Sequence, residues 1–163
     1  MGLASHLGPW LLGTVKNTTG TTPGTIRNMG ATNSTQTGVT TVSDTTAVNL
    51  FVLPAGSQIL DFFVDITTAY AGTTGNTITI ATSTGTTLGT VGSASTTPLA
   101  VGRATFTITG ASIGTYVNVG TTDLIIQATY ACAGTASGGQ ATVTCRYVVR
   151  QADGTYAPTA YTA

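Results

Sequence analysis

The stretch that decides the fold class, SQILDFFVDITTAY, occupies residues 57–70. Apolar side chains recur in it at every second position: Leu60, Phe62, Val64 and Ile66. The intervening positions carry Asp61, Phe63 and Asp65. A period of two places alternate side chains on opposite faces of a β-strand, so the first set is expected to face a core.

Short segments of similar character lie on both sides of this stretch, each bounded by turn-forming residues. They are VNLFVL at 48–53, NTITIAT at 76–82, TLGTV at 87–91, ATFTITG at 104–110, TYVNVG at 115–120, DLIIQATYAC at 123–132 and ATVTCRYVVR at 141–150. Pro54-Ala55-Gly56 predicts a hairpin-like corner between the first two strands. Eight short strands without a helix predict an all-β fold, a single jelly-roll-like β-sandwich rather than a seven-stranded immunoglobulin-type one.

Composition supports strands over helices. The chain of 163 residues contains 39 Thr and 21 Gly, and both residue types are unfavourable in helix interiors. Only 6% of the residues are charged and the formal net charge is zero. These values predict neither nucleic-acid binding nor membrane attachment through a basic patch.

The pattern divides the chain into three parts. They are an extended N-terminal arm at 1–46, a β-sandwich body at 47–150 and a flexible C-terminal tail at 151–163. The arm lacks a sustained apolar period, and its one dense apolar cluster is Trp10, Leu11 and Leu12. We expect this cluster to form an interface with a neighbouring subunit or another protein. The alternative is that it covers the end of its own sandwich.

Residues that could carry catalysis or bind a metal are few. His6 is the only imidazole, and two cysteines do not supply the four ligands of a usual zinc site. Asp61 and Asp65 on one strand face would stand about 13 Å apart, too far for a glycosidase pair. No phosphate-binding or dinucleotide-binding fingerprint occurs. We therefore expect no enzyme activity, no cofactor and no metal.

The two cysteines flank the turn segment GTASGG. If a hairpin turns between Gly138 and Gly139, equal steps outward reach Cys132 and Cys145, which predicts cross-strand neighbours able to form a disulfide outside a reducing cytoplasm. The same register predicts one shared apolar face, made of Leu124, Ile126, Ala128, Tyr130, Val143, Cys145, Tyr147 and Val149.

Thr-x-Thr pairs suggest a further alternative, an ice-binding face. The pairs are Thr77 with Thr79, Thr82 with Thr84, Thr105 with Thr107, and Thr107 with Thr109. Such a face needs pairs stacked at a fixed repeat, and these positions share no constant period. Alternating threonines on solvent-facing strand positions are the simpler interpretation.

Two longer stretches, FVLPAGSQILDFFVDITTAY and VNVGTTDLIIQATYACAGTASGGQATVTCRYVV, resemble small β-rich virion proteins of tailed bacteriophages. The similarity is strongest to capsid decoration, or cement, proteins and covers residues 48–150. Its elements are LPAG before an apolar strand, VDITTA, VGTTDL and a closing YVV.

This resemblance implies a homotrimer on the outer surface of the phage head, assembled in the host cytoplasm. Its partners would be the major capsid protein and further copies of the chain. With few charges, association would depend on shape and apolar contacts and would survive high salt. The alternatives are a tail, baseplate or head-fibre component, or a carbohydrate-binding sandwich that uses Trp10 or the six tyrosines as stacking platforms.

Overall fold

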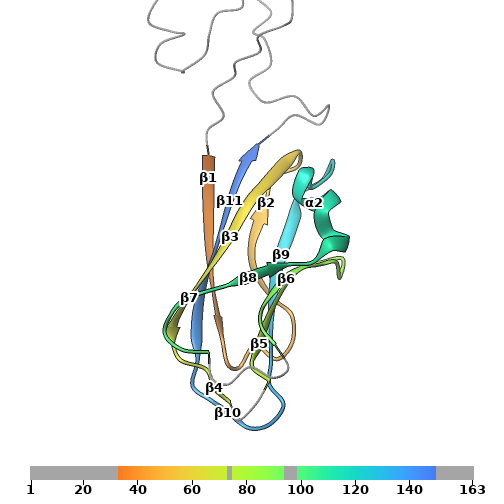
Figure 1. Cartoon of the computed structure of the whole chain (residues 1–163). Helices are drawn as coiled ribbons and strands as arrows, with labels where there is room; N and C mark the ends of the chain where they lie inside the picture. Colours follow the sequence, from red (N-terminus) through yellow and green to blue (C-terminus); the bar gives the residue numbers. More distant parts are fainter. Residues whose placement is uncertain (1–32, 73–74, 94–98, 150–163) are drawn as a thin grey trace, which may run out of the picture. The chain divides into compact units, whose positions relative to one another are not determined.

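The computed structural model describes residues 33–72, 75–93 and 99–149, which form two antiparallel β-sheets packed face to face (Figure 1). The four-stranded sheet has the order β1 (Asn33–Thr41), β11 (Gln140–Val149), β3 (Ser57–Thr68) and β7 (Gly102–Ala104). The five-stranded sheet has the order β2 (Val48–Leu53), β9 (Leu124–Ala131), β5 (Thr77–Thr82), β6 (Thr87–Gly92) and β8 (Phe106–Ile108). Smaller elements are β4 (Ala71–Gly72), β10 (Ala136–Ser137), η1 (Gly110–Ser112) and α2 (Ile113–Val117).

The strand order is that of a jelly roll. The chain passes from one sheet to the other between β1 and β2, β2 and β3, β3 and β5, β6 and β7, β7 and β8, and β9 and β11. This confirms the predicted all-β sandwich. The segment Pro54-Ala55-Gly56 does turn the chain, but it joins strands of different sheets instead of closing a hairpin. No helix among the described residues is long and apolar enough to cross a membrane.

The sandwich begins earlier in the chain than its predicted start at residue 47. Residues Asn33–Thr41 form an edge strand, β1, which pairs along its whole length with β11. The predicted arm at 1–46 is therefore wrong over this span. The pattern missed the strand because its inward-facing positions carry no apolar side chain: they are Ser34, Gln36, Gly38 and Thr40. Gly38 packs closely enough on Leu50 of β2 to explain why a side chain is absent there.

The predicted strand at 115–120 is also wrong, because α2 extends to Val117, directly after η1, and no strand follows it before β9. Ser112 is fully buried, and its hydroxyl donates to the Leu88 carbonyl at 3.1 Å. Tyr116 meets the Phe62 ring edge-on, with 6.0 Å between ring centroids. These contacts outweigh the strand preference of Tyr and Val. The short helix packs on β3 and partly covers the core at that end of the sandwich (Figure 1).

The predicted core face of β3 is confirmed for Phe62, Val64 and Ile66, which are all buried. Leu60 is the exception, since 39% of it is exposed while Ile59 is buried. The cause is a bulge: Tyr147 of β11 pairs with Ile59, whereas Arg146 pairs with Asp61. One extra residue in β3 changes the side on which the preceding residues point.

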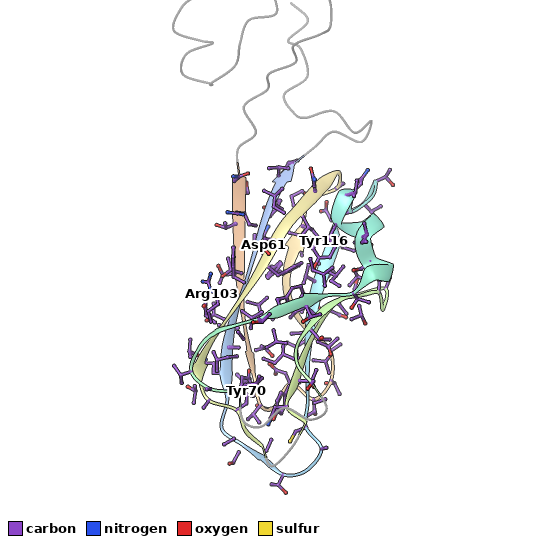
Figure 2. All side chains as sticks on the ribbon, viewed as in Figure 1. Asp61, Tyr70, Arg103 and Tyr116 are labelled. Carbon is purple, nitrogen blue, oxygen red and sulfur yellow. The ribbon has the colours of Figure 1, made fainter. Side chains whose placement is uncertain are left out.

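A buried group of aromatic rings and hydrogen bonds lies at the end of the sandwich away from α2, where Figure 2 shows Tyr70. The Tyr70 hydroxyl donates to the Thr40 carbonyl at 2.9 Å, and its ring lies 4.8 Å from that of Tyr130. Tyr130 in turn bonds to the Asn76 side chain. Asp44 accepts from the Thr40 hydroxyl at 3.1 Å. The ring contact between Tyr70 and Tyr130 spans the two sheets, and the hydrogen bonds hold each ring in place.

This buried chemistry predicts a loss of stability at alkaline pH. Burial raises the pKa of Tyr70 and Tyr116 above the usual tyrosine range, that of Tyr130 to about 12 and that of Cys145 to about 12. Each folded-state pKa lies above its unfolded value, so the neutral forms stabilise the fold below that unfolded value. This contribution is lost as pH rises from about 9 through the folded pKa values.

Urea unfolding should therefore give a free energy that is flat near neutrality and falls steadily above about pH 9. The variant Cys145→Ala should be less stable at neutral pH, because it leaves a small cavity, but should show a shallower decline at the onset of this range. A wild-type free energy that stays constant up to about pH 11 would contradict the assignment of these buried groups.

Candidate interaction face

The outer face of the four-stranded sheet gathers most of the charges of the described chain. Three rows of side chains run across its strands: Thr35–Arg146–Asp61, Thr37–Thr144–Phe63 and Val39–Thr142–Asp65–Arg103. The described residues include six charged side chains, and four of them lie in these rows. We call Asp61, Phe63, Asp65, Arg103 and Arg146 the Phe63 cluster.

Arg103 and Asp65 form a bidentate ion pair within this cluster. The Arg103 Nε donates to Asp65 Oδ1 at 2.8 Å, and its Nη2 donates to Oδ2 at 2.9 Å. The Arg103 hydrogen bonds hold the pKa of the Asp65 carboxyl below its ordinary value. Because both side chains are well exposed, solvent screens the pair and it adds little to stability. Its clearer effect is to fix the orientation of the guanidinium.

Phe63 lies between strands that supply both arginines. The Arg103 guanidinium carbon stands 4.6 Å from the centroid of the Phe63 ring, and that of Arg146 stands 5.6 Å away. Both distances fall within the range of cation–π attraction. The cluster is thus an aromatic ring bordered by two cations and two carboxylates, with no net charge. In Figure 2, Arg103 lies on the outer side of the sandwich, at the left of the view, apart from Tyr116 of α2.

The outer face of the five-stranded sheet is different. Its strands β2, β9, β5, β6 and β8 contain no charged residue. One row of threonines crosses four of these strands: Thr129, Thr79, Thr90 and Thr107. The next row is Ala131, Thr77 and Gly92, so the Thr-x-Thr pairs do not continue as a second rank. Thr82 is buried and bonds to Thr84 within a turn.

The candidate residues from the sequence have different outcomes. Asp61 and Asp65 share an outer strand face, as predicted, together with Phe63. The pattern missed the part played by Arg103, since the three-residue strand that carries it has no apolar period. Trp10, Leu11 and Leu12 lie outside the described residues, as does His6. The prediction of an interface at residues 10–12 therefore stays a prediction.

The predicted hairpin between the two cysteine-bearing strands is wrong. β9 pairs with β2 and β5, whereas β11 pairs with β1 and β3, so Cys132 and Cys145 are not cross-strand neighbours, and no disulfide joins them. The predicted apolar set is still largely buried. Every second residue of β9 and of β11 points into the space between the two sheets, and these are the same residues that would share one face of a hairpin.

The thiols should react at different rates. Cys145 is fully buried and its pKa is raised by burial to about 12, whereas Cys132 is half-buried at the end of β9. Since the thiolate is the reactive form, iodoacetamide near pH 8 should modify Cys132 first, with Cys145 labelled at least about tenfold more slowly. Peptide mapping by mass spectrometry measures both rates. Equal rates, or a Cys132–Cys145 disulfide peptide, would contradict this arrangement.

No group of three or more His, Cys, Asp or Glu side chains within the described ranges could hold a metal ion. The Phe63 cluster supplies two carboxylates, and one of them is already occupied by Arg103. The arrangement therefore favours recognition through a charged and aromatic surface.

No protein-family model matches the chain, and no curated protein matches it. A solved structure described as "Cyanophage Pam1 capsid asymmetric unit" is similar, with a TM-score of 0.46 and 16% sequence identity. The similarity covers 75% of this chain and 88% of that one.

Proposed function

We propose that the chain is a structural virion protein that decorates the outer surface of a phage head and stabilises it by binding the major capsid protein. The observation that carries this proposal is the Phe63 cluster on an otherwise nearly uncharged sandwich. Interface cores favour aromatic residues and arginine, and this sheet presents both on one accessible face. The sequence resemblance to decoration proteins points to the same role.

A binding role fits the geometry better than catalysis or sugar recognition. Arg103 occupies the Asp65 carboxylate, which leaves no pair of free carboxylates at this face. A sugar-binding platform made of tyrosines would need rings that solvent can reach. Tyr70 and Tyr130 are buried in the core.

The size of the face favours binding at several sites at once. The area of the face follows from four strands spaced about 4.8 Å apart, each contributing a length of roughly six residues, and is about 400 Å². This is half of the approximately 800 Å² that each partner buries in a standard interface. A single contact of this size is weak. A homotrimer that engages three capsid sites would gain avidity, and we propose this assembly.

Sedimentation of the full chain with phage heads that lack it tests the proposal. The protein should pellet with the heads at micromolar concentration, and the temperature at which the heads release their DNA should rise. Light scattering should find a trimer that persists in about 1 M sodium chloride, because few ion pairs are available to screen. Failure to bind the heads, with no change in their disruption temperature, would contradict the decoration role.

A further inference from the structure

The two arginines of the Phe63 cluster differ in how their donors are used. Asp65 fills one side of the Arg103 fork with two hydrogen bonds. Arg146 is exposed, and its side chain makes no hydrogen bond or ion pair with the described residues. Its guanidinium is nevertheless positioned, because it lies 5.6 Å from the Phe63 ring centroid. Arg146 therefore offers a guanidinium with unused donors in the middle of the face.

The carboxylates around Arg146 do not take up these donors. Asp61 is its cross-strand neighbour in β3, yet no ion pair within 4.0 Å joins them. The Asp61 Oδ1 instead accepts a hydrogen bond from the backbone N–H of Phe62 at 2.8 Å. Asp65 is committed to Arg103. Both carboxylates are thus bonded to other groups, and the Arg146 guanidinium keeps its donors available for an anionic ligand.

The side chains around Arg146 complete a surface for a protein segment. Thr35 flanks it on β1, and the next rows bring Thr37, Thr144 and the half-exposed Val39. These groups are apolar or weakly polar, and they would surround a bound carboxylate with little water. A guanidinium binds a carboxylate through two parallel hydrogen bonds, and such bonds strengthen as water is excluded.

We propose that the Phe63 cluster is the docking face of the chain and that Arg146 binds a side-chain carboxylate from a loop of the partner protein. The inference rests on the proposed function, which makes that partner the major capsid protein. The partner loop should carry an Asp or Glu that binds Arg146. Beside it should stand an apolar residue that packs on Phe63 and Val39.

The test measures binding of the full chain to phage heads that lack it, with three variants. Arg146→Gln keeps a polar side chain but removes the charge and the guanidinium fork, and it should weaken binding about tenfold or more. Arg146→Lys retains the charge without the fork and should recover part of the loss. Thr107→Val, an isosteric change on the outer face of the other sheet, should bind like the wild type.

Salt dependence gives a second readout that a folding defect would not mimic. Wild-type affinity should fall several-fold from about 0.05 to about 0.5 M sodium chloride, whereas Arg146→Gln should show a nearly flat response. Thermal melting of each variant checks that the sandwich is intact. Because Arg146 is exposed, its replacement should leave the Tm close to that of the wild type.

The outcomes separate the two proposals. If the wild type binds phage heads and Arg146→Gln binds them with the same affinity, the proposed docking face is wrong and the decoration role still stands. Loss of binding by Thr107→Val, with Arg146→Gln unaffected, places the docking face on the five-stranded sheet. Absence of wild-type binding overturns both proposals, and binding to DNA instead overturns the carboxylate assignment.

Discussion

Gly139→Ala is expected to lower the free energy of unfolding by about 3–4 kcal/mol, equivalent to a Tm lower by roughly 10 °C. Gly139 has a φ of +133°, which L-residues with a side chain rarely adopt, and a Cβ built there would stand 2.3 Å from Cδ1 of Tyr70. The Tyr70 ring could not move away freely. It packs on Tyr130 and donates the hydrogen bond to Thr40 that joins β1 to the core.

Gly85→Ala is the matched control for this change. Gly85 also has a positive φ, of +90°, but nothing lies within 4 Å of the position that its Cβ would occupy. This variant should cost only about 1 kcal/mol, the strain of the backbone conformation alone. Urea unfolding of both variants measures the difference. Equal losses would show that Gly139 is not packed against Tyr70.

Removal of residues 1–46 should prevent folding, whereas removal of residues 1–32 should leave a body that melts cooperatively. The longer deletion removes β1, whose 9 residues all pair with β11, and it removes Thr40 and Asp44 from the network around Tyr70. Several backbone hydrogen bonds at about 1 kcal/mol each, with the buried groups left unpaired, approach the whole 5–15 kcal/mol stability of a domain.

Circular dichroism and thermal melting of the two truncated chains decide this boundary. Cooperative melting by the chain that begins at residue 47 would mean that β1 is dispensable. The shorter deletion also tests the predicted interface at Trp10, Leu11 and Leu12. If those residues dock on a neighbour, the chain that begins at residue 33 should fold but bind phage heads about tenfold or more weakly.

Apolar alternation was sufficient to predict the central strands. In β3 and β9 most inward residues are large and apolar and most outward ones are polar, with Phe63 and Ile125 as exceptions, so the period of two is plain in the sequence. β1 has the same geometry without that signal, because Gly38 and Thr40 fill its inner face against Leu50 and Asp44. β1 is a strand because it pairs with residues far along the chain, and a local sequence pattern does not predict such pairing.

Strand pairing was harder to predict than strand position. The equal spacing of Cys132 and Cys145 around the glycine turn is compatible with a hairpin, yet β9 and β11 belong to different sheets. Two strands bury the same alternate residues whether they pair in one hairpin or face each other from two sheets. The alternation of apolar residues therefore does not distinguish the two arrangements. The Phe63 cluster shows the same limit: Asp61, Phe63 and Asp65 were placed on one face, but only the sheet order brings Arg103 beside them.

Quantitative mass spectrometry of purified virions tests the central claim, that this chain decorates the phage head, most directly. The account predicts that the chain is present at several hundred copies per particle, in a fixed ratio to the major capsid protein, and that it remains with DNA-free heads after the tails are removed. A few to a few dozen copies that separate with the tail fraction, or absence from the virion, would contradict it.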